Sequence, residues 1–171
     1  MNSRNELMIK KEALFDLMPI HNQTAFVCDN IALLKREGLY ETALLRAYTG
    51  TKLNFSRWSR RVVEYLFVIA DRQNLIDAGD PIPNEKTFVL YRGVAGVGRK
   101  RRVNGISWTS SMDTAVWFAG RNSRLFFLPD PAVFTVTVSI ESVLAYYNGR
   151  DEAEFLLQLP LPVKPKRVVK L

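Results

Sequence analysis

The sequence predicts an α+β protein in which helices precede strands. Apolar residues recur at helical spacing from residue 6 to residue 73, whereas β-forming residues dominate from residue 87 onward. A loop with two prolines, at 79–84, ends the helical part. The 171 residues suffice for one compact domain with a substantial core. We therefore expect a single domain, 1–171, with a helical N-terminal region at 1–78 and a β-rich region at 86–171.

The N-terminal region carries four helix patterns, each with an apolar stripe on one side. Asn5 is a possible cap of the first helix, which ends at Pro19, and Gly38 closes the second. Arginines crowd the first turns of the fourth helix and form either a solvated face or the lining of a groove for an anion. These arginines are Arg57, Arg60 and Arg61, and the expected helices are 6–18, 24–37, 40–48 and 56–73.

The later region alternates β-forming residues with turns. Residues 133–138, Val-Phe-Thr-Val-Thr-Val, alternate most cleanly and form the strongest predicted strand. A helix is expected at 112–120. The other expected strands are 87–92, 103–109, 143–146, 154–159 and 167–170.

The composition limits the classes of function. Lys and Arg total 24 against 17 Asp and Glu, a net charge of +7, which favours a polyanionic partner or a phosphate-bearing ligand. Cys28 and His21 are the single cysteine and histidine, so we expect no disulfide framework and no zinc or other transition metal. His21 is expected in a loop. Without an apolar run of about 18 residues or a signal-peptide core, the sequence predicts a cytoplasmic protein with no membrane partner.

Two motifs follow the loop at 79–84. In Tyr91-Arg92-Gly93 an arginine ends a predicted strand beside an approachable glycine backbone, which suits bidentate phosphate binding, or else an ordinary edge salt bridge. In 107–111, Ser-Trp-Thr-Ser-Ser, strand alternation presents Ser107 and Thr109 on one face and Trp108 on the other. Ser110 or Ser111 is expected to cap the following helix.

A glycine-rich loop at 93–100 separates these motifs but lacks the Gly-Lys-Ser/Thr of a phosphate-binding Walker loop. We expect it to be mobile. The adjoining basic run 99–102 either touches a substrate or is only solvated.

The segment 146–157, Tyr-Tyr-Asn-Gly-Arg-Asp-Glu-Ala-Glu-Phe-Leu-Leu, joins an acidic turn to an apolar strand. Asn148-Gly149 is expected to supply the positive φ of the turn. If the backbone is extended, Glu152 and Glu154 share a face about 6.5 Å apart, at the solvent-facing lip of the strand. Two such carboxylates can stabilise a developing cation and position a nucleophile. The alternative is a solvated acidic turn.

In this order, the three motifs resemble the arginine–serine–glutamate class of mono-ADP-ribosyltransferases, which includes bacterial toxins and vertebrate ecto-enzymes. The resemblance covers residues 87 to about 160. It implies a helical region followed by a pair of packed, mostly antiparallel sheets, with NAD in the cleft between them.

The resemblance also implies roles for individual residues. Arg92, flanked by Tyr91 and Gly93, contacts the phosphate and ribose of NAD. The serine–threonine–serine motif falls on 107–109, with Trp108 in its middle, or on 109–111; Ser107 or Thr109 supplies the supporting hydroxyl. Glu154 is the catalytic glutamate, and Glu152 is the first acid of the Glu-x-Glu pair that accompanies an arginine acceptor.

The expected function is therefore cleavage of the nicotinamide–ribose bond of NAD, a co-substrate, with transfer of ADP-ribose to a protein, on arginine, and without a metal. An NAD glycohydrolase with the same site is the first alternative. The others are a non-catalytic basic nucleic-acid-binding module, built on 57–61 and 99–102, and a related enzyme that modifies RNA or DNA. Phe118, Phe126 and Tyr147 are candidates to stack on nicotinamide, although core packing is the expected role of the two phenylalanines.

Overall fold

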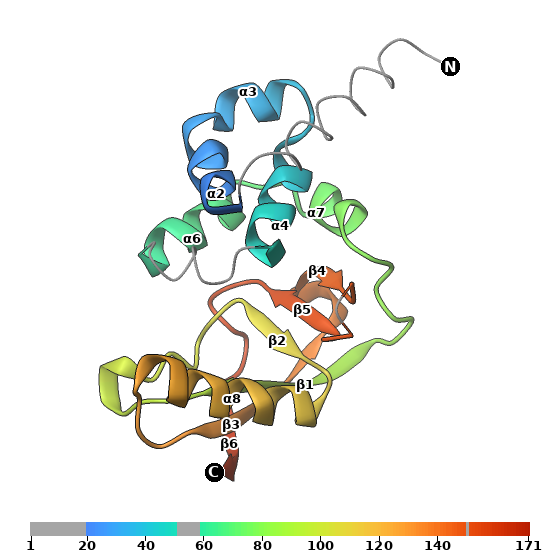
Figure 1. Ribbon diagram of the computed structural model, residues 1–171. Helices are drawn as coiled ribbons and strands as arrows, with labels where there is room; N and C mark the ends of the chain where they lie inside the picture. Colours follow the sequence, from blue (N-terminus) through green and yellow to red (C-terminus); the bar gives the residue numbers. More distant parts are fainter. Residues whose placement is uncertain (1–19, 51–58, 150) are drawn as a thin grey trace. The chain divides into compact units, whose positions relative to one another are not determined.

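The computed structural model describes residues 20–50, 59–149 and 151–171 (Figure 1). These residues form an α+β protein, as predicted, with helices first and a sheet later. The chain divides into two compact units, Met1–Ala78 and Gly79–Leu171, at the limit of the predicted helical region. That both units belong to one domain remains a prediction. The expected helix at 6–18, with Asn5 and Pro19, lies outside the described residues, as do Arg57 and Trp58.

The described part of the first unit contains more and shorter helices than predicted. The expected helix at 24–37 is interrupted at Asn30, whose φ is −121° and whose Nδ2 donates to Phe26 O at 2.9 Å. Such local bonding by asparagine competes with the helix ladder. The expected loop residue His21 lies in a helix. The helices are α2 (Ile20–Asp29), α3 (Ile31–Arg36), α4 (Tyr40–Gly50), α6 (Arg60–Val68) and α7 (Arg72–Ala78).

Asp71 is the reason that the expected helix at 56–73 does not continue. Its Oδ1 accepts from Asn74 N at 2.9 Å and so starts α7, while its own N–H donates to the buried Glu41 carboxylate at 2.9 Å. Buried Tyr40 ties α4 to α6, because its hydroxyl donates to Leu66 O at 2.8 Å. Burial, with a smaller contribution from Glu41, raises the pKa of Tyr40 well above its ordinary value.

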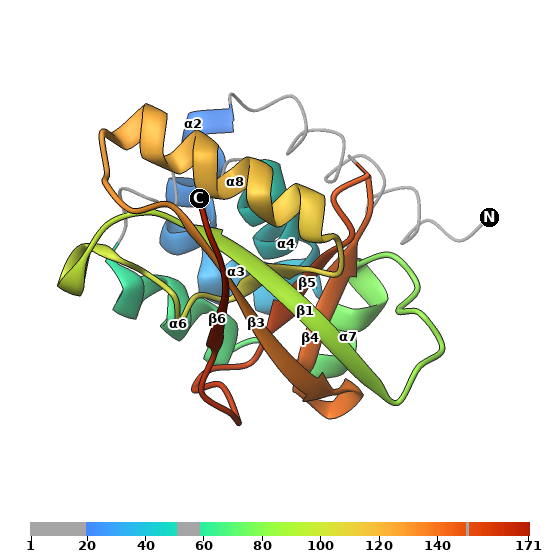
Figure 2. The same cartoon turned by 90° about the horizontal axis from the view of Figure 1, so that it is seen from below.

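The second unit contains one continuous antiparallel sheet, so the expected pair of sheets is wrong. Its strand order is β4-β5-β2-β1-β3-β6. The central strand β1 pairs with β3 along its whole length, and Figure 2 shows the two strands side by side. Its pairing with β2 at Tyr91–Thr109 joins the two halves of the sheet. The strands are β1 (Thr87–Val94), β2 (Ser107–Thr109), β3 (Ala132–Ser139), β4 (Val143–Tyr147), β5 (Glu154–Leu157) and β6 (Lys166–Lys170).

The helix α8 (Met112–Phe126) crosses one face of β1 and β3, as Figure 2 shows. Ser111 caps it, as predicted, with Oγ accepting from Thr114 N at 3.1 Å. A Cβ on Gly93 would lie 1.8 Å from Ala115 O, so this glycine is needed for the approach of α8. The Gly93 backbone, expected to face a ligand, is covered by the helix instead. The main core on the sheet consists of Phe88, Leu90, Trp108, Val136, Val138, Val143, Phe155 and Leu157.

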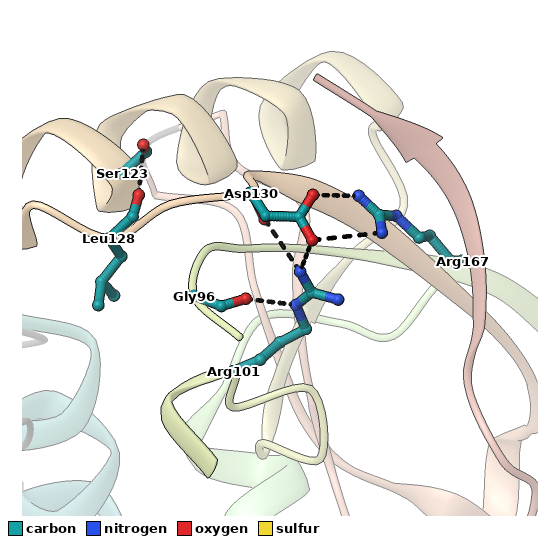
Figure 3. Close-up of polar contacts among 6 residues, drawn as sticks. All are labelled: Gly96, Arg101, Ser123, Leu128, Asp130 and Arg167. Carbon is teal, nitrogen blue, oxygen red and sulfur yellow. Dashed lines mark hydrogen bonds and ion pairs between the residues drawn. The ribbon is translucent and has the colours of Figure 1, made fainter. Parts of the chain in front are cut away.

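The loop at 93–100, expected to be mobile, is held at two points. Gly96 N donates to Pro129 O at 2.6 Å, and Arg101 Nε donates to Gly96 O at 2.7 Å. Arg101 also forms an ion pair with Asp130, and the other side of this carboxylate binds Arg167 Nη2 at 2.6 Å (Figure 3). A short helix, η1 (Gly98–Lys100), completes the loop. Arg101 therefore serves the fold, whereas Arg99, Lys100 and Arg102 are exposed.

The Asp130 cluster predicts an acid-sensitive contribution to stability. Hydrogen bonds from Arg167 and then Arg101 lower the pKa of Asp130 to about 2. Because the folded pKa is depressed, the contribution is complete above about pH 4 and is lost as the pH falls toward 2. Urea unfolding across this range should show a smaller pH dependence for Asp130→Asn than for the wild type. Identical slopes for the two proteins would contradict the assignment.

Candidate functional site

Glu154 opens β5, a strand with neighbours on both sides. It pairs with Thr109 of β2 and with Tyr147 of β4. Its side chain is only 2% exposed, so the expectation of a carboxylate at a solvent-facing lip is wrong. β5 is paired on both sides, so Glu154 lies within the sheet and not at its edge. A carboxylate at such a position requires polar partners to offset its desolvation.

Arg92, Ser107 and Glu154, from three different strands, form a chain of contacts. Ser107 Oγ donates to Glu154 Oε1, and Arg92 Nη1 donates to the backbone oxygen of Ser107. Arg92 Nε donates to Arg102 O at 3.3 Å. A Cβ on Gly105 would lie 2.4 Å from Arg92 Nη2, so this glycine makes room for the guanidinium. The sequence analysis did not single out Gly105, although its position just before the Ser-Trp-Thr strand made it a candidate site residue.

The Thr109 side chain binds the backbone of the acidic segment that precedes β5. Its hydroxyl donates to Glu152 O at 2.6 Å and accepts from Ser111 N at 3.0 Å. Ser110 N donates to Ala153 O at 3.3 Å. The serine–threonine–serine motif was expected at 107–109 or at 109–111. In the first register both hydroxyls, of Ser107 and Thr109, bind residues of the segment 152–154. In the second register, Ser111 caps α8 instead.

The turn before Glu154 has an unexpected conformation. Among its described residues, the positive φ values belong to Asp151 (54°) and Ala153 (42°), not to Asn148 or Gly149. A Cβ on Gly149 would instead lie 2.4 Å from the Tyr147 hydroxyl oxygen. Since Ala153 is left-handed and β5 begins only at Glu154, the extended geometry assumed for the two glutamates is wrong. Positive φ in non-glycine residues stores about 1–2 kcal/mol each, and such strain gathers at functional sites.

Asp80 anchors this turn from outside it. Its N–H donates to Tyr146 O at 2.8 Å, and its Oδ2 accepts from Asn148 N at 2.6 Å. Asn148 in turn binds both Asp151 N and Ala153 N at 3.0 Å. Burial, and to a lesser extent Asp80, raises the pKa of Tyr146. The sequence marked Asp80 only as part of a proline-containing connection and gave no sign of this contact.

The remaining predicted ligand residues, apart from Phe126, lie in packed surroundings. Trp108 is 1% exposed within the core and donates from Nε1 to Gly105 O at 2.8 Å. Tyr91 packs against α8. Among the stacking candidates, Phe118 contacts the Trp117 ring, and Phe126 lies exposed at the far end of α8. Tyr147, the direct strand partner of Glu154, is the aromatic of the three that the structure places at the site.

Comparisons with models of protein families, with curated proteins and with solved structures find no match. Among the described residues, no group of three or more His, Cys, Asp and Glu side chains is arranged to hold a metal ion. Within the same residues, no helix combines the length and apolar character needed to cross a membrane.

Proposed function

We propose that the protein is a mono-ADP-ribosyltransferase that cleaves the nicotinamide–ribose bond of NAD and transfers ADP-ribose to arginine of a protein. The observation that carries the proposal is the contact chain Arg92–Ser107–Glu154. Motifs that lie 62 residues apart in the sequence supply one guanidinium, one hydroxyl and one carboxylate to a continuous set of contacts. This donor set fits NAD, since a guanidinium suits the pyrophosphate and a carboxylate suits the ribose hydroxyls.

Glu154 has the chemical properties that bond cleavage requires. Departure of nicotinamide leaves positive charge on the ribose, as in glycoside cleavage, and a fixed carboxylate stabilises that charge. The Ser107 hydroxyl fixes Oε1 before the substrate arrives. Surroundings with little water strengthen the attraction between the carboxylate and the cation.

Access to Glu154 requires movement, because its side chain is 2% exposed. We assign the movement to residues 151–153, which directly precede Glu154 and include the strained residues Asp151 and Ala153. These residues are held by hydrogen bonds, among them those from Thr109 to Glu152 O and from Ala153 N to Asn148 Oδ1. Breaking these bonds would release strain and leave the pairing of β5, which begins at Glu154, intact.

Glu152 is assigned to the acceptor. It is half-buried between the two strained residues, and its backbone oxygen is held by Thr109. Glu152→Gln should therefore lose transfer to arginine and keep NAD hydrolysis, because its carboxylate binds the acceptor guanidinium and not the ribose. Parallel assays of ADP-ribosylated protein and free ADP-ribose measure the two activities. Equal loss of transfer and of hydrolysis would contradict the assignment of Glu152 to the acceptor.

Incubation with NAD labelled in its adenylate part tests the proposal against its alternatives. The expected result is label on protein, released by reagents that cleave arginine linkages. Label only as free ADP-ribose would indicate a glycohydrolase, and label on RNA or DNA would indicate a nucleic-acid acceptor. If NAD stays intact after incubation with folded protein and both kinds of acceptor, the non-catalytic basic nucleic-acid-binding module is the remaining alternative.

A further inference from the structure

The last two residues of α8 and the residue that caps it expose three consecutive apolar side chains, Leu125, Phe126 and Phe127, which we call the tip. Phe127 is 93% exposed, the highest value among the exposed large apolar side chains of the described residues. Scattered single apolar residues are normal on a surface, but contiguous ones mark sites of contact. The tip takes no part in the candidate site described above.

The tip is held in an unfavourable conformation. Phe127 has φ 50° and ψ 43°, a left-handed position at the end of a helix where glycine is usual. The position is fixed by Ser123, whose O accepts from Leu128 N at 3.0 Å and whose Oγ donates to Leu128 O at 2.7 Å (Figure 3). The fold thus presents a bulky ring to solvent at a position that glycine would occupy with less strain.

Basic side chains adjoin the tip through the contacts of the 93–101 loop. Gly96 N binds Pro129 O, and Arg101 binds Asp130, so η1 lies beside the chain that follows the tip. Figures 1 and 2 both place η1 and the C-terminal end of α8 at the same end of the second unit. Val97 adds another exposed apolar side chain there. The exposed basic residues of this surface are Arg99, Lys100 and Arg124.

Acidic residues do not offset this charge. Between residues 96 and 130 the chain has six Arg and Lys but only two Asp. Asp113 lies in the first turn of α8, at the opposite end of that helix, and Asp130 is already paired with two arginines. The surface is therefore apolar at its centre and positively charged around it.

We propose that this surface docks on a membrane that contains anionic lipids. Exposed aromatic and aliphatic side chains enter the boundary between headgroups and acyl chains, while Lys and Arg bind the negative headgroups. Val97 and Leu125 favour a lipid over a nucleic acid, because aliphatic side chains offer no ring for base stacking. The sequence predicted no membrane partner, since the basic run and the aromatic residues become neighbours only in the folded chain.

The tip lies away from the candidate site, so docking through the tip does not cover that site. The site adjoins Thr109 and Ser111, at the start of α8, and the tip lies at its end. Fifteen helical residues at about 1.5 Å each separate the two by roughly 22 Å. The docking surface and the proposed active site use different residues, so an experiment can refute either proposal without refuting the other.

Co-sedimentation of the full chain with lipid vesicles tests the proposal. The chain should bind vesicles of phosphatidylcholine mixed with phosphatidylserine, bind phosphatidylcholine alone far less, and dissociate at high salt. Phe127→Gly should lower the partition coefficient about tenfold or more by removing the exposed ring. Glycine suits this backbone position, so the variant should fold at least as stably as the wild type. Arg99→Ser and Lys100→Ser should each lower the partition coefficient about fivefold.

Matched controls lie elsewhere on the same unit. Val89→Thr and Lys86→Ser change an exposed apolar and an exposed basic residue near the start of β1 and should bind as the wild type does. Failure of the wild type to bind mixed vesicles, equal binding to both lipid compositions, or unchanged binding by Phe127→Gly would each overturn the proposal. Phe127-dependent binding of a single-stranded oligonucleotide without vesicle binding would assign the surface to nucleic acid instead.

Discussion

Glu154→Gln is expected to lower the rate of NAD cleavage by about 10²–10³, the usual loss when one preorganised electrostatic contact is removed. The substitution keeps the size of the side chain and an oxygen that accepts from Ser107, but it removes the negative charge. Since that charge acts mainly in the transition state, affinity for NAD should change little. Transfer and hydrolysis should fall together, because both pass through the same cation. Initial rates at saturating NAD measure the effect.

The stability of this variant needs its own measurement, because Glu154 is buried and hydrogen-bonded. Replacing a charged acceptor by a neutral one should cost about 1 kcal/mol, which leaves the protein folded. Glu85→Gln is a matched control, since Glu85 is exposed in the loop before β1. A folded Glu154→Gln protein that turns over NAD at a near-normal rate would refute the assignment of Glu154.

Arg92→Ala is expected to weaken NAD binding by about 2–5 kcal/mol if its guanidinium pairs with a desolvated phosphate. Arg92→Lys should also bind weakly, because an ammonium cannot reproduce the planar fork. Backbone oxygens of Ser107 and Arg102 orient that fork, so the geometry and not the charge alone is expected to matter. Calorimetric titration with NAD measures the affinity.

The two Arg92 variants need a comparison that separates binding from folding. Arg99→Ala removes the same charge from an exposed position in η1 and should leave NAD affinity unchanged. Urea unfolding then shows how much of the Arg92→Ala effect reflects lost contacts with the two carbonyls. Unaltered NAD affinity in folded Arg92→Ala would remove Arg92 from the site.

Local patterns in the sequence predicted the elements well. The alternation at 133–138 lies within β3, and Ser111 caps α8 as expected. Short-range chemistry decides such features, and the sequence displays it directly. The expected strand at 103–109 is reduced to Ser107–Thr109, because Gly105 N donates to Val103 O at 2.8 Å and bends the chain there.

The features that the sequence did not predict depend on contacts between residues far apart in the chain. Glu154 looked exposed because its own segment is polar, but it lies on a strand that pairs with β2 and β4 and is buried in the folded chain. Gly93 looked available to a ligand, yet α8, which begins 19 residues later, covers it. The turn conformation was missed because positive φ was assigned to Asn148-Gly149, and because an alanine such as Ala153 seldom takes positive φ.

Release of nicotinamide from NAD by the wild-type chain tests the central claim most directly, since transfer and hydrolysis both begin with that bond. The proposed site predicts release over many turnovers, strongly reduced in Glu154→Gln and retained in Glu85→Gln. No release by the folded wild-type protein, with protein and nucleic-acid acceptors present, would contradict the claim. Equal release by the wild type and Glu154→Gln would contradict it as well.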